Sequence, residues 1–281
     1  MLESTDFSTQ DIDILEGSGR ELKLRLFTPD GAEAAPFVVD LHGGAWCAGA
    51  YEECFDRDEV FAKAGVAAAS LDFRDAEHGY PTSSIDINYA IRWLKAHAAE
   101  LGLDPARAGV TGQSSGGHLA MLAAMRPDDA RYCEIALPAG APDVDASVQA
   151  VAMNWPVINP LSRYYNAQNE REKGTGWVGD IPERHDTYWK TEAAMEEGNP
   201  VLILERGEDV QLPPALWVQG RPDPVHDYRD PNNERDINEP DRFLENYRNA
   251  GGEIELVEIG QSNRDETSSD PQAAFFAKQF G

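Results

Sequence analysis

Short runs of mainly apolar residues recur along the chain and alternate with stretches in which apolar residues fall three or four positions apart. A continuous apolar run of about 4–8 residues is typical of a strand covered on both faces, and the wider spacing is typical of an amphipathic helix. The strands predicted in this way are 36–41, 66–73, 107–111, 148–153, 214–220 and 254–259. The predicted helices lie near 57–64, 83–99 and 118–125, from Pro240 onward and from Asp270 onward. This alternation predicts an α/β fold with a mostly parallel central sheet and helices on both faces.

The first part of the chain has a different pattern. Residues 11–15 and 21–27 alternate polar and apolar positions, and Gly17-Ser18-Gly19 separates them. Alternation indicates a strand with one covered face, and a connection that contains glycine favours a hairpin. We therefore expect an antiparallel pair of strands ahead of the parallel sheet.

Between about residue 156 and residue 205 the alternation of strands and helices stops. Aromatic residues are set there among charges, glycines and prolines, with helical character near 186–197. We interpret 156–205 as a small cap inserted over the functional site, and a surface excursion with a few packed aromatic side chains is the alternative. Because no break in composition divides the 281 residues, we expect 1–281 to form a single domain.

The pentapeptide Gly112-Gln113-Ser114-Ser115-Gly116 lies between a predicted strand and a predicted helix. G-x-S-x-G in this context is the nucleophile elbow, in which glycines make room for a sharp turn and the serine is exposed at its tip. About 70 residues earlier, His42-Gly43-Gly44 follows the strand 36–41. A loop of this type in this order supplies an oxyanion hole. The two motifs together favour acyl transfer with Ser114 as the nucleophile.

The charge of the chain is strongly negative, with 50 acidic and 24 basic residues and a formal net charge of −26. Nucleic acids and anionic membranes are poor partners for such a surface. A dense carboxylate surface suits high salt, which screens the repulsion, so a halophilic or marine source is one explanation.

No targeting, membrane or metal signal is found in the sequence. The N-terminus is acidic and polar, and no apolar run reaches the roughly 18 residues of a membrane span, so we expect a cytoplasmic protein. The three cysteines lack zinc-like spacing. We therefore expect free thiols, no metal and no cofactor. The expected partner is a small-molecule ester substrate, with a homodimer as an option.

These motifs resemble the α/β-hydrolases, in particular the hormone-sensitive-lipase-like esterases and their feruloyl-esterase and kynurenine-formamidase relatives. The resemblance spans most of 36–260, in order. It is carried by His42 to Trp46, Asp72-Phe73-Arg74, Tyr80-Pro81, Asp86, Trp93-Leu94, Leu103-Asp104-Pro105, Gly112 to Gly117, Gln219-Gly220 and Asp223-Pro224-Val225.

The resemblance implies the α/β-hydrolase fold and a role for each matching residue. Ser114 would attack an acyl carbonyl, and Asp223 stands where the family places its triad acid. The oxyanion would be held by the backbone N–H groups of Gly43, Gly44 and Ser115. Contacts to the substrate are expected from His42, which also braces the oxyanion loop, and from Trp46, Gln113 and His185.

One departure from the family pattern concerns the base. The family places its histidine after the last strand, here in Gly260-Gln261-Ser262-Asn263-Arg264, and no histidine follows His226. A serine hydroxyl is a weak nucleophile without an adjacent base. His226 stands three residues after Asp223, one helical turn, so it can contact that carboxylate and lean toward Ser114. We take His226 as the best candidate base. A cap histidine such as His185, or no base at all, are the alternatives.

Two classes of function follow. The first is a serine hydrolase of the carboxylesterase class (EC 3.1.1) that cleaves small or medium acyl esters through an acyl-enzyme, with amide or formamide bonds as a variant. The second is a ligand-binding protein without turnover, because plant gibberellin receptors keep this fold and lack the triad histidine.

Overall fold

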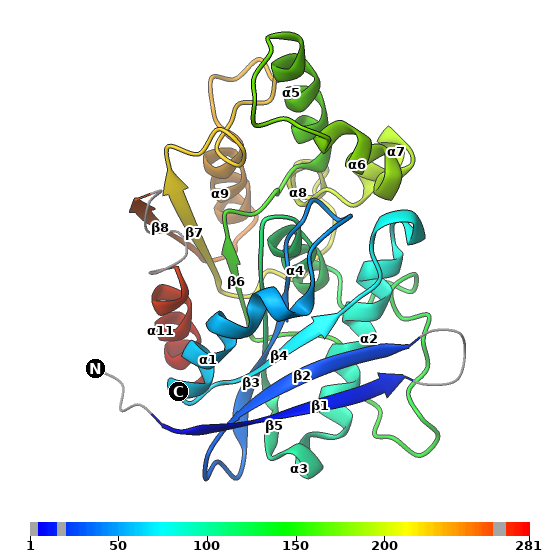
Figure 1. The fold of residues 1–281 in the computed structure, drawn as a ribbon, viewed down its shortest axis with the longest axis vertical. Coiled ribbons are helices and arrows are strands. Elements are labelled where there is room, and N and C mark those ends of the chain that lie inside the picture. The colour runs from blue at the N-terminus through cyan, green and yellow to red at the C-terminus, as the bar shows by residue number, and fades with distance from the viewer. Residues whose placement is uncertain (1–4, 16–20, 261–267) are drawn as a thin grey trace.

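The computed structural model describes residues 5–15, 21–260 and 268–281. Its centre is an eight-stranded sheet in the order β1-β2-β4-β3-β5-β6-β7-β8 (Figure 1). The strands are β1 (Phe7–Leu15), β2 (Leu22–Pro29), β3 (Ala35–Leu41), β4 (Ala67–Asp72), β5 (Leu103–Gln113), β6 (Ala150–Asn154), β7 (Ala215–Arg221) and β8 (Ile254–Gly260). β2 pairs antiparallel with both β1 and β4, and the other strand pairs are parallel. The predicted sheet is confirmed, and the predicted Gly17–Gly19 connection lies outside the described residues.

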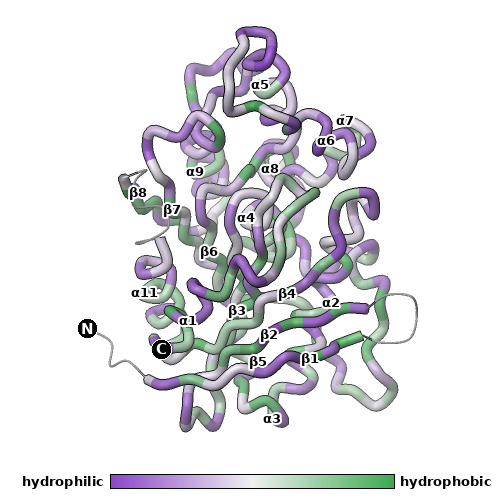
Figure 2. Tube along the Cα trace, in the orientation of Figure 1, coloured by the Kyte–Doolittle hydropathy of each residue, from purple (hydrophilic) through white to green (hydrophobic). Residues whose placement is uncertain are grey.

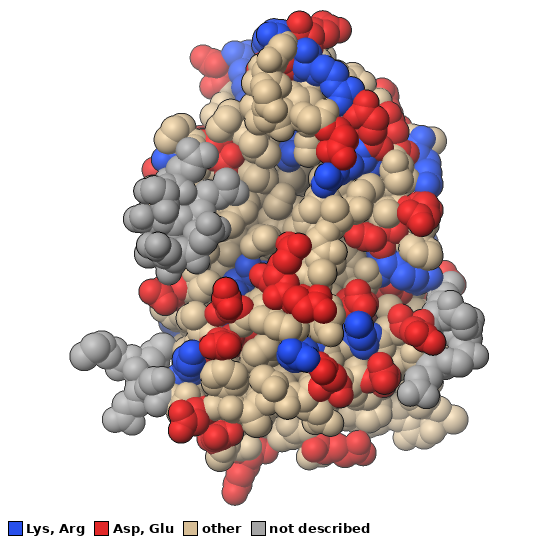
Figure 3. All heavy atoms as spheres, in the orientation of Figure 1, with Lys and Arg blue, Asp and Glu red and all other residues tan. Residues whose placement is uncertain are grey.

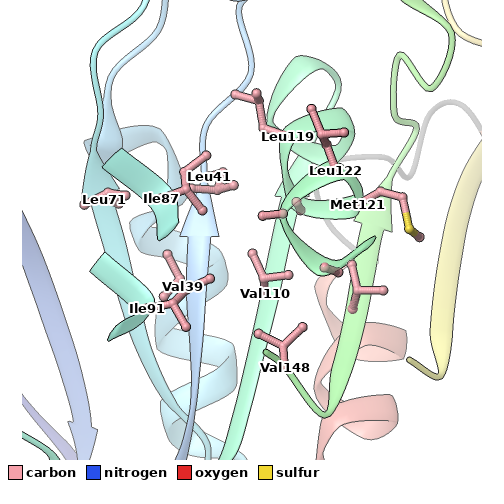
Figure 4. Close-up of a cluster of buried hydrophobic side chains, with 14 of the residues drawn as sticks. Val39, Leu41, Leu71, Ile87, Ile91, Val110, Leu119, Met121, Leu122 and Val148 are labelled. Carbon is pink, nitrogen blue, oxygen red and sulfur yellow. The ribbon is translucent and has the colours of Figure 1, made fainter. Parts of the chain in front are cut away.

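Helices cover both faces of this sheet. Val38 faces the side on which α1 (Phe55–Lys63) and α11 (Ser269–Phe280) pack together. Val39, the next residue along β3, faces the opposite side, because side chains alternate along a strand (Figure 4). That side is covered mainly by α2 (Thr82–Ala96), α3 (Ala98–Leu101), α4 (Ser115–Met125) and α9 (Glu239–Asn249).

Burial of apolar surface holds these layers together. Val39, Val110 and Ile91 are all fully buried, and each such side chain contributes about 1.5–3 kcal/mol relative to an exposed position. Figure 2 shows the apolar residues concentrated along the central strands and the polar residues toward the outside. The rigid sheet fixes where the carboxyl ends of its strands lie, and the candidate site is built on those ends.

The segment between β6 and β7 is more helical than predicted. It forms α5 (Pro160–Glu172), α6 (Ile181–Trp189), α7 (Glu192–Glu197) and α8 (Pro200–Glu205), whereas the sequence pattern predicted helix only near 186–197. Figure 1 shows α5, α6 and α7 beyond the carboxyl ends of the parallel strands. Its role as a cap stays a prediction.

Two Asn-Pro pairs explain the additional helices of this segment. The Asn159 side chain accepts from the Ser162 N–H at 3.0 Å, and Asn199 accepts from the Val201 N–H at 3.1 Å. In each case the asparagine satisfies an N–H group that has no partner within the helix, and the following proline already has a helical φ.

Acidic side chains spread over the visible face of the molecule, with fewer basic ones among them (Figure 3). Within the described residues, none of the helices combines the length and the apolarity that a membrane crossing requires.

Raising NaCl from 0.1 M to 1 M is expected to raise the Tm by a few degrees. The net charge of −26 makes the folded surface repel itself, and the Debye length shortens from about 10 Å to about 3 Å over this range. In a domain of this size about 1 kcal/mol shifts Tm by roughly 2–4 °C. Calorimetry in NaCl and in KCl measures the shift, and a flat or falling Tm would remove the argument for a high-salt habitat.

Candidate active site

Ser114 stands between the end of β5 and the first residue of α4. Its φ of 53° and ψ of −118° lie in a region that L residues rarely adopt. A Cβ on Gly112 would lie 2.5 Å from the Gly116 carbonyl carbon, and a Cβ on Gly116 would lie 2.3 Å from the Leu41 carbonyl oxygen. Because only glycine fits at both positions, the pentapeptide forms the predicted strand–turn–helix elbow.

The loop after β3 lies directly against this elbow. An ideal Cβ on Gly43 would be 3.4 Å from the Ser114 Cβ, and one on Gly44, at φ +107°, would meet the Ala48 carbonyl oxygen at 1.8 Å. In the described part of the chain, neither Gly43 nor Gly44 donates its N–H to a backbone carbonyl. Ser115 begins α4, so its N–H has no partner within the helix. Three backbone donors are thus available beside the serine for a developing oxyanion.

His42 braces the loop, in line with the sequence analysis. Its Nδ1 lies 2.8 Å from the Gly43 carbonyl oxygen, and its ring stacks on Phe73 with 4.4 Å between centroids. The Trp46 Nε1 donates to His118 Nδ1 at 3.2 Å. These contacts fix the loop from the side of the core.

Helix α6 packs on the same loop. The Trp46 ring contacts His185, with centroids 5.0 Å apart, and Trp189, with centroids 5.4 Å apart. Arg184 donates from Nη1 to the Gly44 carbonyl oxygen at 3.2 Å. The segment between β6 and β7 therefore holds the oxyanion loop in place.

A chain of hydrogen bonds connects Ser114 with a histidine and a carboxylate. The Ser114 Oγ lies 3.0 Å from His226 Nε2, and His226 Nδ1 lies 2.9 Å from Asp223 Oδ2. Both partners are buried, with Asp223 at 2% and His226 at 7% exposure. They sit on the turn that follows β7, where Asp223 Oδ1 also accepts the N–H groups of Val225 at 3.1 Å and His226 at 3.3 Å.

This geometry determines what the imidazole can do. A carboxylate only accepts hydrogen bonds, so His226 Nδ1 carries the proton that faces Asp223. In the neutral ring Nε2 then has its lone pair directed at the Ser114 hydroxyl. The arrangement is that of a general base oriented by an acid and within reach of a nucleophile.

The two buried histidines near the loop are unsuited to that task. Desolvation by burial lowers the pKa of His118 to about 4 and the pKa of His185 to about 3. Bases with such pKa values have little affinity for a serine proton at neutral pH. His118 Nε2 lies 2.7 Å from the Gly198 carbonyl oxygen and its Nδ1 accepts from the Trp46 indole, so the ring connects the oxyanion loop with the residues before α8 instead.

Three of the four residues expected to contact the substrate are buried in the structure. His42, Trp46 and His185 are 3%, 1% and 0% exposed, and their contacts support the oxyanion loop, so a direct contact of these residues with the substrate stays a prediction. Gln113 stays half-buried, and its Oε1 accepts a hydrogen bond from Arg57 Nη1 at 3.0 Å.

Arg57 and Asp40 are supporting residues that no motif reveals. Arg57 on α1 binds the buried Asp40 carboxylate through Nε and Nη2, both at 2.6 Å, and reaches Gln113 next to the nucleophile. The available signal is Asp40 itself, a charged residue in the otherwise apolar strand 36–41, because buried charges require a partner.

A serine held in this way after the central strand of a mostly parallel sheet characterises the α/β-hydrolases. The fold is similar to that of EstE1, a thermostable carboxylesterase cloned from a metagenomic library. The TM-score is 0.72 at 22% identity, covering 99% of this chain and 91% of that one. The sequence model of the BD-FAE family matches residues 24–232. The chain therefore belongs to the BD-FAE family of α/β-hydrolases.

Curated relatives have esterase names. The probable carboxylic ester hydrolase LipM of Mycobacterium tuberculosis is 34% identical over 118 residues, which are 41% of this chain and 26% of LipM. Esterase LipQ of the same organism is 27% identical over 225 residues, which are 78% of this chain and 50% of LipQ. The chain thus spans half or less of the length of these two relatives.

Proposed function

We propose that the protein is a serine carboxylic-ester hydrolase that acts through an acyl-enzyme on small or medium acyl esters. The observation that carries this proposal is the hydrogen-bonded series Ser114–His226–Asp223 beside three available backbone N–H donors. Membership of the BD-FAE family and the esterase names of LipM and LipQ support it.

The residues act in two half-reactions. His226 Nε2 accepts the Ser114 proton while Oγ attacks the acyl carbonyl, and the N–H groups of Gly43, Gly44 and Ser115 stabilise the oxyanion. His226 then gives that proton to the leaving alcohol. In the second half-reaction the same imidazole deprotonates a water, which releases the acid and restores the serine.

The base in this proposal comes from an unusual place. His226 lies three residues after Asp223, on the turn after β7, whereas the related esterases are expected to take it from the loop after their last strand. Residues 261–267 of that loop lie outside the described residues. The triad is therefore atypical in spacing while it keeps the order serine, acid, histidine.

The alternatives from the sequence fit the site less well. The ligand-binding hypothesis depended on the lack of a base, and the contact between His226 and Ser114 favours turnover. Amide or formamide cleavage uses the same groups and stays a variant. A homodimer in the cytoplasm stays an expectation, which sedimentation and fractionation can test.

Turnover of p-nitrophenyl esters from acetate to octanoate tests the proposal. We expect the highest kcat/KM for short or medium chains, and rapid labelling of Ser114 by a fluorophosphonate, since only an activated serine reacts quickly. Mass spectrometry of the labelled peptide identifies the site. A protein inert to the whole ester series and to the fluorophosphonate would instead support the ligand-binding hypothesis.

A further inference from the structure

Arg163, in the first turn of α5, is a buried cation whose guanidinium is incompletely hydrogen bonded within the described part of the chain. The side chain is 2% exposed, and two of its three nitrogens, Nε and Nη1, have no hydrogen-bond acceptor among the described residues. Burial lowers the pKa of this guanidinium, yet arginine stays protonated in proteins. An uncompensated buried charge destabilises the fold.

The other buried arginines of the described chain are fully compensated. Arg57 forms a bidentate salt bridge with Asp40, and Arg242 forms salt bridges with both Glu205 and Glu239. Burial of an arginine in this protein is therefore accompanied by a carboxylate in direct contact. Arg163 is the exception, and exceptions of this kind concentrate at functional sites.

The position of Arg163 relates it to the catalytic groups. The hydroxyl of the neighbouring Ser162 hydrogen bonds with the Tyr228 hydroxyl at 3.2 Å. Tyr228 stands two residues after His226 in the chain. The segment that leads into α5 meets the elbow, because the Val157 N–H donates to the Ser114 carbonyl oxygen at 3.0 Å. The charges of Asp223 and Arg163 are close enough to interact electrostatically.

The guanidinium of Arg163 lies among ring side chains. The Arg163 Cζ lies 5.7 Å from the centre of the Trp177 ring, and His185, fully buried, is a further neighbour that its charge reaches. Trp177 is half-buried on the short connection between α5 and α6. Trp177 is therefore the neighbour of the guanidinium that borders solvent, whereas His185 is fully buried.

We propose that Arg163 is a specificity-determining residue of the substrate pocket and that the ester substrate carries a carboxylate that binds its guanidinium. A carboxylate matches the planar fork of arginine through two parallel hydrogen bonds. It would supply both a negative charge in direct contact with the guanidinium and the missing acceptors. The inference rests on the proposed ester hydrolysis. The carboxylate belongs either to the acyl part, as in a half-ester of a dicarboxylic acid, or to the alcohol part, as in an ester of a hydroxy acid.

Matched ester pairs separate these two sources. Mono-p-nitrophenyl glutarate against p-nitrophenyl butyrate tests the acyl part, and 4-acetoxybenzoate against phenyl acetate tests the alcohol part. For the wild type we expect kcat/KM to favour the charged member of one pair by at least about 10-fold, because a site built to hydrogen-bond a polar group can discriminate by up to about 10⁴- to 10⁵-fold against an analogue that lacks it. Equal rates within both pairs would overturn the inference while leaving the esterase proposal intact.

Variants at Arg163 test the residue itself. Arg163→Met keeps most of the side-chain volume and should abolish the preference for the charged ester, and Arg163→Lys should retain part of that preference. Arg171→Met is the matched control, because Arg171 is exposed on the same helix and pairs with Glu183. That variant should keep the full preference.

Thermal unfolding separates recognition from a structural role. Arg163→Met should raise the Tm, because it removes a buried charge that lacks a partner. A lower Tm together with an equal loss of activity on both members of a pair would make Arg163 structural and overturn the inference. Glutarate should raise the Tm of the wild type and leave Arg163→Met unchanged. This measurement still tests the anion site if the protein proves inert to every ester. If glutarate does not raise the Tm of the wild type, the inference is overturned.

Discussion

Ser114→Ala is expected to lower kcat for p-nitrophenyl butyrate by about 10⁶-fold, the size of effect seen when a serine nucleophile is removed. The variant keeps the backbone donors of the oxyanion hole and loses the hydroxyl that forms the acyl-enzyme in the proposed mechanism. Initial rates at saturating substrate measure the effect, after the background hydrolysis of the ester has been subtracted.

Fold retention is the control for this variant. Ser114 is only partly buried, and its side chain bonds chiefly to His226, so the Tm should change little. Fluorophosphonate labelling should disappear. If Ser114→Ala keeps more than a few per cent of the wild-type turnover with an unchanged Tm, the nucleophile lies elsewhere and the elbow hypothesis is wrong.

The parts of the fold that the sequence predicts well are those fixed by local sterics and by complete burial. The strand 36–41 is apolar almost throughout because both faces of β3 are covered, and β3 occupies 35–41. The elbow is predictable because the backbone around Ser114 excludes any Cβ at Gly112 and Gly116. Each of these signals is contained in a few adjacent residues.

Edges and insertions are less predictable. β1 begins at Phe7, ahead of the predicted 11–15, because Ser8, Thr9 and Gln10 are exposed on an edge strand and show no apolar alternation. The helices α5 and α8 carry a usable signal in Asn159-Pro160 and Asn199-Pro200. That signal concerns only the start of a helix and not its length.

In the candidate site, contacts between residues close in sequence are predictable and contacts between distant elements are not. Asp223 and His226 are close in sequence, so one helical turn suffices to predict their contact, and the distance of 2.9 Å agrees with that prediction. Arg57 and Asp40 are 17 residues apart, and Arg163 and Trp177 belong to different elements. Their relations depend on tertiary packing, which no local pattern encodes.

His226→Ala is expected to lower kcat by about 10⁴- to 10⁶-fold, because among the described residues Ser114 then has no base within hydrogen-bonding distance. Residual turnover on the order of 10³ over water would come from the oxyanion hole and substrate binding. Asp223→Asn should lower kcat by about 10⁴-fold, since an amide can hold the imidazole in the wrong tautomer. Initial rates on p-nitrophenyl butyrate give kcat for the wild type, His226→Ala and Asp223→Asn.

The test of His226 is sharpest with a matched histidine and with chemical rescue. His78→Ala removes an exposed imidazole and should leave kcat unchanged. Added imidazole should restore part of the activity of His226→Ala, because the small molecule can occupy the space that the ring leaves beside Ser114, and it should not restore Ser114→Ala. If His226→Ala hydrolyses the ester as fast as the wild type, another group supplies the base, and the atypical triad is wrong even though the protein is an esterase.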